Sequence, residues 1–586
     1  MFLITTPIED TWKKSGKILF LGEWCKIYSR KSIWSKLDYE VLPYHWDDRE
    51  KYYQDYKKLG IVYEKYLSKT ALLLNEYHSC DHSLRYWRIV IGFWLSYLIN
   101  ILFDRYSSIN TVRRYHSIDS TFVMKNDCKK WVASNFLDFR NQFRTDNWNH
   151  FIYGELIKYV DDIPYEIIGL DKIPNNKKSK TNGINKKVIK KIFNQYKDWI
   201  PDSRNQVAFV DHTFNTFDII KLQLSLKQFP IPDYYSNLNM EIGTLDIPFR
   251  KSTKLNCGNS EFDQLLNILI PRLIPSAYLE NYKTIKNRCL DFYPNKVSAI
   301  YTTSSYSGNE GFKIWAAEKT NNGSKLIIGP HGGGFGNSLF DQSLDHQLDI
   351  SDRYFSWGWE SPNKKNDVVP LPADKLISIK KKLKPKSEGD ILLVCASFPR
   401  YFYYMGSYPI AGQFLKYIDD QLSFISNLSE DVKSLLKIRL HTQRRGLGWD
   451  IGLRLNDYGY KSLIDTNTNH LYDRINQSRL CIATYNATVF LETLSANIPT
   501  ILYWDPNHSE NNAMAQPYFN ELRSVGILHD SPENAAKMVN EIYSNPCTWW
   551  NQQEIQIIIK KFCEKFAYVG DDWINEWKTE LQSLID

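Results

Sequence analysis

The sequence predicts an α/β protein with two Rossmann-type domains that face a cleft and a largely helical insertion in the N-terminal domain. Three observations support this class. The chain has 586 residues, which is more than one hydrophobic core usually supports. Short apolar runs alternate with helical patterns in two separate stretches, as in parallel sheets with helical crossovers. A stretch rich in Lys, Pro and Asp separates the two.

The expected N-terminal domain, residues 1–372, opens with two short apolar runs that favour first strands of a sheet. Residues 52–106 then show helical spacing of apolar side chains. Residues 107–235 mix Asn, Lys, Asp and aromatic residues without a sustained period, so we expect a helical and loop insertion there. Between residues 297 and 329 a strand, a helix and a second strand follow one another, which is typical of a parallel βαβ crossover. A third strand is expected at residues 354–357.

The C-terminal domain is expected at residues 390–552, after a linker at residues 373–389. Four strands are predicted here, at residues 390–396, 438–440, 480–484 and 500–503. The helices between them are predicted at residues 412–426 and 488–496. We expect the final helices, within residues 553–586, to pack back on the N-terminal domain. Two α/β sheets in series with a charged linker form the architecture that is called GT-B in glycosyltransferases.

Composition excludes several function classes. The formal charge of +7 is modest for this length, and it comes partly from the Lys-rich residues 172–191. That run suits a solvated loop or a contact with anionic lipid. It is not accompanied by a zinc finger, an aromatic RNA platform or a DNA-reading helix, so nucleic acid is not an expected partner. The nine cysteines form no CxxC pair and no zinc-spaced cluster, which indicates reduced thiols.

The longest apolar stretch, residues 89–103, is flanked by Arg88 and Asp104. It is shorter than the roughly 20 residues that a membrane-spanning helix needs, so a buried helix is expected. At the N-terminus the apolar residues precede the charged ones, the reverse of a secretory signal. We therefore expect a cytoplasmic protein, with peripheral association at the inner face of the cytoplasmic membrane as a further option.

The strongest local pattern lies at residues 479–506. A predicted strand ends in a small polar loop that contains Asn486, and a helix follows with Thr488 as its expected N-cap. Helix N-termini suit a nucleotide phosphate. Glu492, one turn later, is placed to accept hydrogen bonds from ribose hydroxyls, or it is only a first-turn acid that the helix dipole favours. The next strand brings Asp505 to the same carboxyl edge, where ligands of open α/β folds bind.

A second pattern is GPHGGGFGN at residues 329–337, directly after a predicted strand. The three consecutive glycines Gly332, Gly333 and Gly334 permit close backbone approach to a ligand, and His331, at the strand end, is a candidate catalytic residue. Glu310, at the start of the preceding helix, is a candidate general base or nucleophile. Structural roles for His331 and Glu310 stay open at this point.

Two further clusters carry chemistry. His441, Arg439 and Arg444 follow a predicted strand and suit a nucleotide phosphate or a sugar carboxylate, or they form a basic surface turn. Asp47 and Asp48, in the string YHWDDRE, are candidates for an acceptor site or a base, or they belong to an ion-pair network that anchors a helix.

Seven strings together resemble a transferase family found in O-antigen and other surface-polysaccharide gene clusters. They are LFLGEWC (19–25), YHWDDRE (44–50), RYWRIVIGFWL (85–95), DRY (104–106), GPHGGGFGN (329–337), SDRYFSWGW (351–359) and the segment 486–506. The ordered set runs from the first predicted strand to the last predicted sheet. The resemblance implies a glycosyltransferase that acts on a surface polysaccharide, either O-antigen or capsule.

The family is similar in layout to GT-B enzymes that transfer nonulosonic or Kdo-type keto-acid sugars from CMP donors, such as Kdo, pseudaminyl and sialyltransferases. The resemblance implies that His441 contacts the donor phosphate, although Thr442 follows it where sialyltransferases have proline. It also implies a nucleotide-sugar substrate, a glycan or lipid-linked glycan acceptor, no cofactor and no metal. Two alternatives stay open: a sugar-nucleotide epimerase or polyol-phosphate transferase, and a non-catalytic polysaccharide-assembly subunit.

Overall fold

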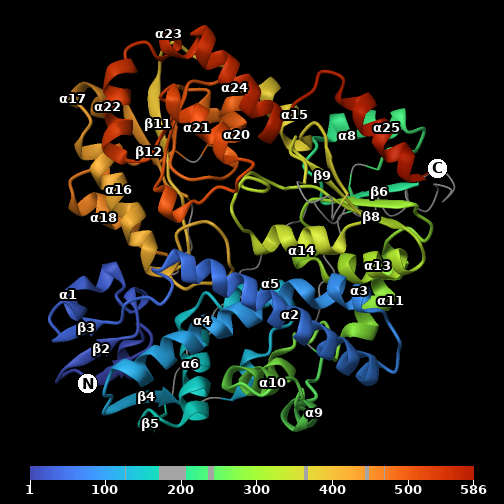
Figure 1. The fold of residues 1–586 in the computed structure, drawn as a ribbon, viewed down its shortest axis with the longest axis vertical. Helices are drawn as coiled ribbons and strands as arrows, with labels where there is room; N and C mark the ends of the chain where they lie inside the picture. Colours follow the sequence, from blue (N-terminus) through green and yellow to red (C-terminus); the bar gives the residue numbers. More distant parts are fainter. Residues whose placement is uncertain are drawn as a thin grey trace.

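The computed structural model describes residues 1–125, 127–169, 206–231, 233–234, 243–361, 367–441, 448–467 and 469–585. These residues form three five-stranded sheets (Figure 1). All the strand pairs in them are parallel. The α/β class and the two Rossmann-type sheets that face a cleft are confirmed. A further sheet precedes these two in the chain.

The first sheet has the order β3-β2-β1-β4-β5. Its strands are β1 (Phe2–Ile4), β2 (Ile18–Phe20), β3 (Tyr39–Val41), β4 (Ser120–Met124) and β5 (Tyr165–Ile168). The structure therefore differs from the insertion expected at residues 107–235, because β4 and β5 lie within it. The same stretch also holds β6 (Val207–Val210) and the helices α5 (Phe136–Gln142), α6 (Asp146–Val160) and α8 (Thr216–Ser225).

Long helices lie between the first sheet and the middle sheet (Figure 1). Helix α2 (Arg49–His78) begins after Asp48, whose carboxylate accepts a 3.0 Å hydrogen bond from the backbone N–H of Lys51. Next come α3 (Leu84–Trp87), the π-helical turn η4 (Arg88–Gly92) and α4 (Phe93–Tyr115). This run is long and apolar enough to cross a membrane, but 94% of its most apolar window is buried inside the protein. The expected buried helix is confirmed.

The middle sheet has the order β10-β9-β8-β7-β6. After β6, its strands are β7 (Ala299–Thr302), β8 (Lys325–Ile328), β9 (Arg353–Ser356) and β10 (Val368–Pro370). Helix α13 (Glu310–Asn321) joins β7 to β8, so the predicted βαβ crossover is present. The side chain of Asn309 caps this helix by accepting a hydrogen bond from the N–H of Phe312.

The C-terminal sheet has the order β12-β11-β13-β14-β15. Its strands are β11 (Asp390–Val394), β12 (Leu436–Arg439), β13 (Ser478–Ala483), β14 (Thr500–Tyr503) and β15 (Leu528–His529). The strand order reverses between β11 and β13. In open α/β sheets, ligands bind at the carboxyl ends of the strands at such a reversal.

Two connections join the C-terminal sheet to the middle sheet. The stretch 373–389, expected as a linker, contains helix α15 (Asp374–Lys382). Near the end of the chain, α24 (Gln553–Phe566) packs on the C-terminal domain, and α25 (Trp573–Ile585) packs on the middle sheet. The two connections meet, because the N–H of Ala373 donates a 2.7 Å hydrogen bond to the carbonyl of Tyr568.

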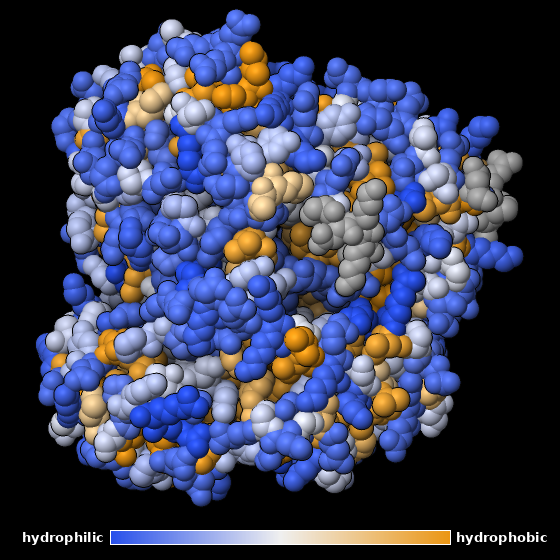
Figure 2. All heavy atoms as spheres, viewed as in Figure 1, coloured by the Kyte–Doolittle hydropathy of each residue, from blue (hydrophilic) through white to orange (hydrophobic). Residues whose placement is uncertain are grey.

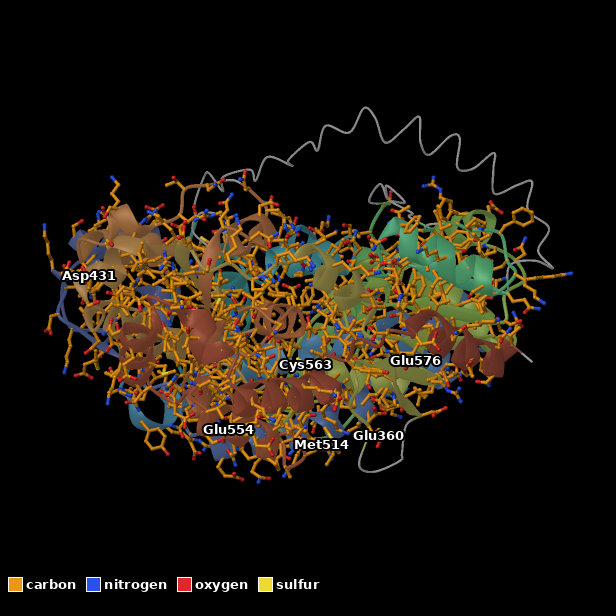
Figure 3. All side chains as sticks on the ribbon, turned by 90° about the horizontal axis from the view of Figure 1, so that it is seen from above. Glu360, Asp431, Met514, Glu554, Cys563 and Glu576 are labelled. Carbon is orange, nitrogen blue, oxygen red and sulfur yellow. The ribbon has the colours of Figure 1, made fainter. Side chains whose placement is uncertain are left out.

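Figure 3 shows this arrangement from above: Cys563 marks α24, and Glu576 marks α25 further along the same side of the molecule. Trp577 of α25 is buried, and its indole N–H donates a 2.8 Å hydrogen bond to the carbonyl of Pro372. Hydrophilic residues predominate on the face drawn in Figure 2, and apolar residues occur there in scattered groups. Single apolar side chains on a surface are ordinary in folded proteins.

Candidate active site

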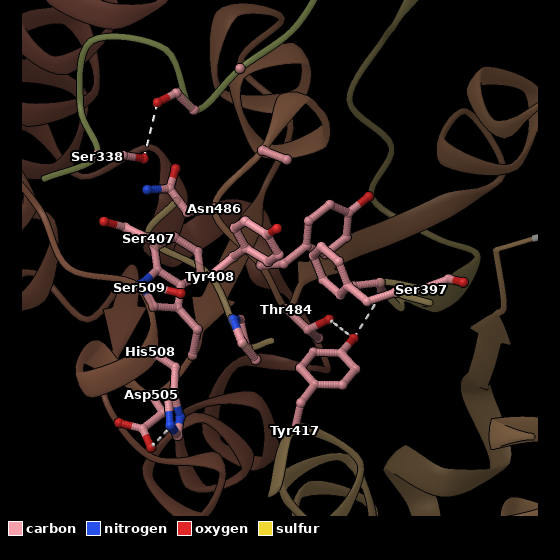
Figure 4. Close-up of a pocket in the computed structure, with 18 of the residues that line it drawn as sticks. Ser338, Ser397, Ser407, Tyr408, Tyr417, Thr484, Asn486, Asp505, His508 and Ser509 are labelled. Atoms are coloured by element: carbon pink, nitrogen blue, oxygen red, sulfur yellow. Dashed lines mark hydrogen bonds and ion pairs between the residues drawn. The ribbon is translucent and has the colours of Figure 1, made fainter. Parts of the chain in front are cut away.

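The carboxyl edge of the C-terminal sheet and the loop after β8 enclose a cavity of about 490 Å³. The ends of β11, β12, β13 and β14 contribute to its lining, so the cavity lies where the strand order of this sheet reverses (Figure 4). Residues of the loop after β8 close it from the side of the middle sheet. The cavity volume suits a small-molecule ligand.

The glycine-rich loop after β8 touches the start of helix α20 (Thr488–Ser495). The backbone N–H of Gly333 donates a 2.9 Å hydrogen bond to Oγ1 of Thr488. A Cβ atom on Gly333 would lie 2.6 Å from the carbonyl oxygen of Ala487, and one on Gly332 would lie 2.4 Å from Oγ1 of Thr488. A Cβ atom essentially never lies this close to an oxygen to which it is not bonded. The close contact between the loop after β8 and the start of α20 therefore requires glycine.

A second bond crosses the same junction. The side chains of Asn337 and Asn486 are joined at 3.2 Å. Gly334, at φ +93°, turns the backbone in the left-handed region that glycine tolerates. The loop and the helix start therefore form one rigid corner of the cavity.

Helix α20 presents its N-terminal end at this corner. Its N-cap is Ala487, which makes no side-chain cap. The expectation that Thr488 is the N-cap was wrong, because the Thr488 hydroxyl accepts from Gly333 instead. The first N–H groups of a helix lack partners within the helix, and the helix dipole adds partial positive charge there. An anionic group is therefore favoured at this end of the cavity.

Aromatic side chains line another part of the cavity. They come from residues 398–409, directly after β11. Phe398 stacks on Tyr408 with ring centroids 5.1 Å apart, and Tyr408 stacks on Tyr404 at 4.9 Å. Stacked rings of this kind suit a nucleobase or a sugar ring. Sequence reasoning missed this segment, although six aromatic residues within FPRYFYYMGSYP after a strand were a usable indication.

Hydrogen bonds fix the floor of the cavity. The hydroxyl of Tyr417 accepts a 2.7 Å bond from the N–H of Ala396 and lies 2.6 Å from Oγ1 of Thr484. The hydroxyl of Tyr503 donates a 2.7 Å bond to Gln421. Lys416, which also lines the cavity, forms an ion pair with Asp420. None of these residues was identified from the sequence.

Three histidines, His331, His441 and His508, line the cavity. His331 exposes surface to the cavity interior. The protein around that cavity desolvates the ring, and with a smaller repulsion from Lys375 it lowers the pKa of His331 to about 4. Burial, assisted by Arg49, also lowers the pKa of His508. Both rings are therefore neutral at pH 7. His508 was not identified from the sequence.

A match to a known family decides the class of the protein. The family model described as "LIC12162 family transferase" matches residues 1–581. The chain belongs to this family. No curated protein sequence matches the chain. Among solved structures, MurG of Acinetobacter baumannii aligns with 11% sequence identity and a TM-score of 0.30, over 64% of this chain and 99% of that chain.

The transferase family confirms the coarser part of the resemblance given above. Within this LIC12162 family member, several predicted donor residues and the predicted catalytic residue His331 meet in one place. The cavity lining includes His331, Gly333, Gly334, His441, Asn486, Thr488 and Asp505. Gly332 packs directly behind them, against Thr488.

Other predicted donor residues lie elsewhere. Glu492 is 3% exposed and is held by the hydroxyl of Tyr472 and the ammonium of Lys375, each at 2.9 Å. It anchors α15 to α20 and does not face the cavity. Arg439 turns away to pair with Asp465 at 3.2 Å, because the loop after Asp465 offers it backbone carbonyls. Arg444 lies outside the described residues, as does the Lys-rich run 172–191.

The predicted catalytic acids are also separated from the cavity. Glu310 is 3% exposed and pairs with Lys313 at 2.6 Å. Its other oxygen accepts hydrogen bonds from the N–H of Phe136 and the hydroxyl of Tyr278, so this carboxylate is sealed inside the protein. Asp48 caps helix α2.

Asp47 lies in a different place from these acids. It lines a second cavity, of about 210 Å³, at the edge of the first sheet. Gln413, another residue of that lining, donates a 3.3 Å hydrogen bond to Asp47. Among the described residues, no group of three or more His, Cys, Asp or Glu side chains is placed to hold a metal ion.

Proposed function

We propose that this transferase is a glycosyltransferase that binds a nucleotide-linked sugar in the 490 Å³ cavity. One observation carries the proposal: the N-terminal end of α20 meets a glycine-rich loop at the carboxyl edge of a parallel sheet. A helix N-terminus beside exposed backbone N–H groups favours phosphate. The aromatic segment at residues 398–409 supplies a surface for the base or the sugar.

The donor is a substrate, not a cofactor, in this proposal. Its phosphate lies near Thr488, Gly333 and His441, while Asn486 contacts the nucleotide side. We propose a CMP donor that carries a nonulosonic or Kdo-type keto-acid, on the strength of the sequence resemblance. The keto-acid carboxylate would find cationic or hydrogen-bonding partners in Lys416 and His331.

The acceptor is proposed to enter from the side of the first sheet. The 210 Å³ cavity there is lined by Trp24 and Tyr44, whose rings suit a sugar, and by the acids Glu23 and Asp47, which suit sugar hydroxyls. The acceptor would be a glycan or lipid-linked glycan of O-antigen or capsule. We place the activity in the cytoplasm, at the inner face of the membrane when the acceptor is lipid-linked. Membership in a transferase family favours group transfer over the epimerase and the non-catalytic subunit.

A ligand screen tests the proposal. The full chain is melted in the presence of CMP, UDP and a panel of CMP- and UDP-sugars, and transfer to a glycan acceptor is followed by mass spectrometry. A ligand present at 100 times its dissociation constant adds about 2.7 kcal/mol to stability, so we expect a clear rise in melting temperature with the correct donor. A chain that neither binds nor consumes any of these compounds contradicts the proposal.

A further inference from the structure

The turn that follows β14 holds an Asp–His pair inside the cavity wall. Asp505 is the N-cap of the short helix η9 (Pro506–His508). Its Oδ1 accepts hydrogen bonds from the backbone N–H of Asn507 at 2.9 Å and from the side-chain amide of the same residue at 3.0 Å. Its Oδ2 lies 3.4 Å from Nδ1 of His508. The carboxylate is therefore held at one oxygen and presents the other to the imidazole (Figure 4).

This pairing selects the tautomer of His508. A carboxylate oxygen only accepts hydrogen bonds, so its position favours the neutral tautomer with the proton on Nδ1. The lone pair is then on Nε2, the nitrogen that Asp505 does not occupy. Both residues line the 490 Å³ cavity, as does the neighbouring Ser509.

The surroundings of His508 come from two parts of the fold. The charges of Arg49, the first residue of α2, and of Asp47, two residues earlier, act on His508 together with those of Glu510 and Asp505. Arg49 binds Glu510 through two hydrogen bonds of 2.7 and 2.9 Å. Asp47 belongs to the lining of the smaller cavity, so His508 lies on the side from which the acceptor is proposed to come.

We propose that His508, oriented by Asp505, is the general base that activates the acceptor hydroxyl in the glycosyl transfer proposed above. In this step Nε2 takes the hydroxyl proton while the acceptor oxygen forms a bond to the anomeric carbon of the donor. The bond between that carbon and the phosphate oxygen breaks, and the nucleotide leaves with its electron pair. The imidazolium then returns its proton to solvent, so one glycosidic bond forms for each donor bond broken.

The inference rests on the proposed function, so the test measures donor binding and transfer separately. The variants are His508→Gln and Asp505→Asn, with His529→Gln as the matched control. His529 is a partly buried histidine of the same domain, in β15, and its Nε2 lies 2.9 Å from the carbonyl of Gly526. Binding of the CMP- or UDP-sugar found in the screen is measured by calorimetry, and kcat is measured with the glycan acceptor.

We expect His508→Gln to bind the donor within about threefold of the unmodified chain and to lose about 10²- to 10⁴-fold in kcat, the usual contribution of a general base. Asp505→Asn keeps the cap on η9, and we expect it to lose about tenfold or more. His529→Gln should retain the full rate.

The pH profile separates a base from a structural role. The rate should fall on the acid side as His508 becomes protonated. Because the Asp505 charge raises the pKa of His508, this acid limb should move to lower pH in Asp505→Asn. Unchanged kcat in both variants, or an acid limb that does not move, overturns the assignment of His508 and leaves the glycosyltransferase intact. If His508→Gln does not fold, Asp505→Asn decides the matter. Failure of the unmodified chain to bind any donor overturns the proposed function instead.

Discussion

At the scale of single residues, one missing Cβ atom shapes the candidate site. Gly333 brings the loop after β8 close enough for its N–H to reach Thr488, and a side chain at this position would overlap the carbonyl oxygen of Ala487. The oxygen belongs to the backbone and cannot rotate away. The corner of the cavity that should receive the phosphate thus depends on the size of this one residue.

We expect Gly333→Ala to weaken donor binding by about tenfold or more, because overpacking of this kind costs about 1–3 kcal/mol. Titration calorimetry with the donor measures the effect. Gly60→Ala in α2 is the control, since a Cβ there meets nothing within 4 Å. Donor binding by Gly333→Ala equal to that of the unmodified chain would show that the phosphate lies elsewhere.

At the scale of secondary-structure elements, helix α13 contains a buried ion pair whose carboxylate also binds α5. Glu310 and Lys313 are both sealed from solvent, and Glu310 also accepts from Phe136 of α5. Burial lowers the pKa of Lys313, while the Glu310 charge opposes that shift. Both residues belong to α13, and the hydrogen bond from the N–H of Phe136 to Glu310 joins this helix to α5.

Glu310→Ala leaves Lys313 buried and unpaired, which typically costs about 3–5 kcal/mol of stability. We expect a marked drop in melting temperature by scanning calorimetry and an unchanged dissociation constant for the donor. Glu430→Ala, at an exposed ion pair, should change stability by no more than about 0.5 kcal/mol. A folded Glu310→Ala protein that binds donor normally but has lost transfer would return Glu310 to the catalytic candidates.

Seven of the ten strands of the two later sheets were predicted from apolar runs bounded by turn residues, whereas β6, β10 and β15 were not. Strand β14 has the predicted ends, and β8, β11 and β13 differ from prediction by one or two residues at their ends. In the first sheet the two expected first strands correspond to β1 and β2, whereas β3, β4 and β5 were not predicted. Strand β5 exposes Glu166 and Ile167 at the sheet edge, so it lacks an apolar run, and α2 and α4 separate β3 from β4 by a long interval.

The predicted site residues also fall into two groups, those that line the cavity and those that do not. Residues tied to a strand end, such as His441, Asn486 and Asp505, fall in the cavity as predicted. Glu310 and Glu492 do not, because the sequence position on a helix does not show which buried partner the side chain meets. His508 was missed because its role comes from Asp505 and from Arg49, which is remote in sequence.

At the scale of the whole molecule, an ion pair joins the start of α2 to the turn after β14. Arg49 and Glu510 are largely buried, and Arg49 also donates to Gln413 and to the carbonyl of Tyr408. This junction places the N-terminal part of the chain beside His508. The three sheets thus contribute to one site even though only two of them face the larger cavity.

Arg49→Met and Glu510→Gln should each lower the melting temperature, and the double variant should be no less stable than the worse single one. The reason is that Arg49→Met leaves Glu510 without the hydrogen bonds from Arg49, and Glu510→Gln leaves Arg49 without the opposite charge, whereas the double change leaves neither charge unpaired. A coupling energy of about 0.5–3 kcal/mol is expected for such a pair. Additive effects of the two changes would show that the pair does not couple the two parts.

The bond between Ala373 and Tyr568 has a mechanical consequence. The chain passes between the middle and C-terminal domains twice, and this bond ties the two passages together at one place. Two separate passages would connect the two domains at two places, whereas these joined passages connect them at one. Widening of the donor cavity would also break the bonds that join its two sides away from that place, Gly333 to Thr488 and Arg49 to Glu510.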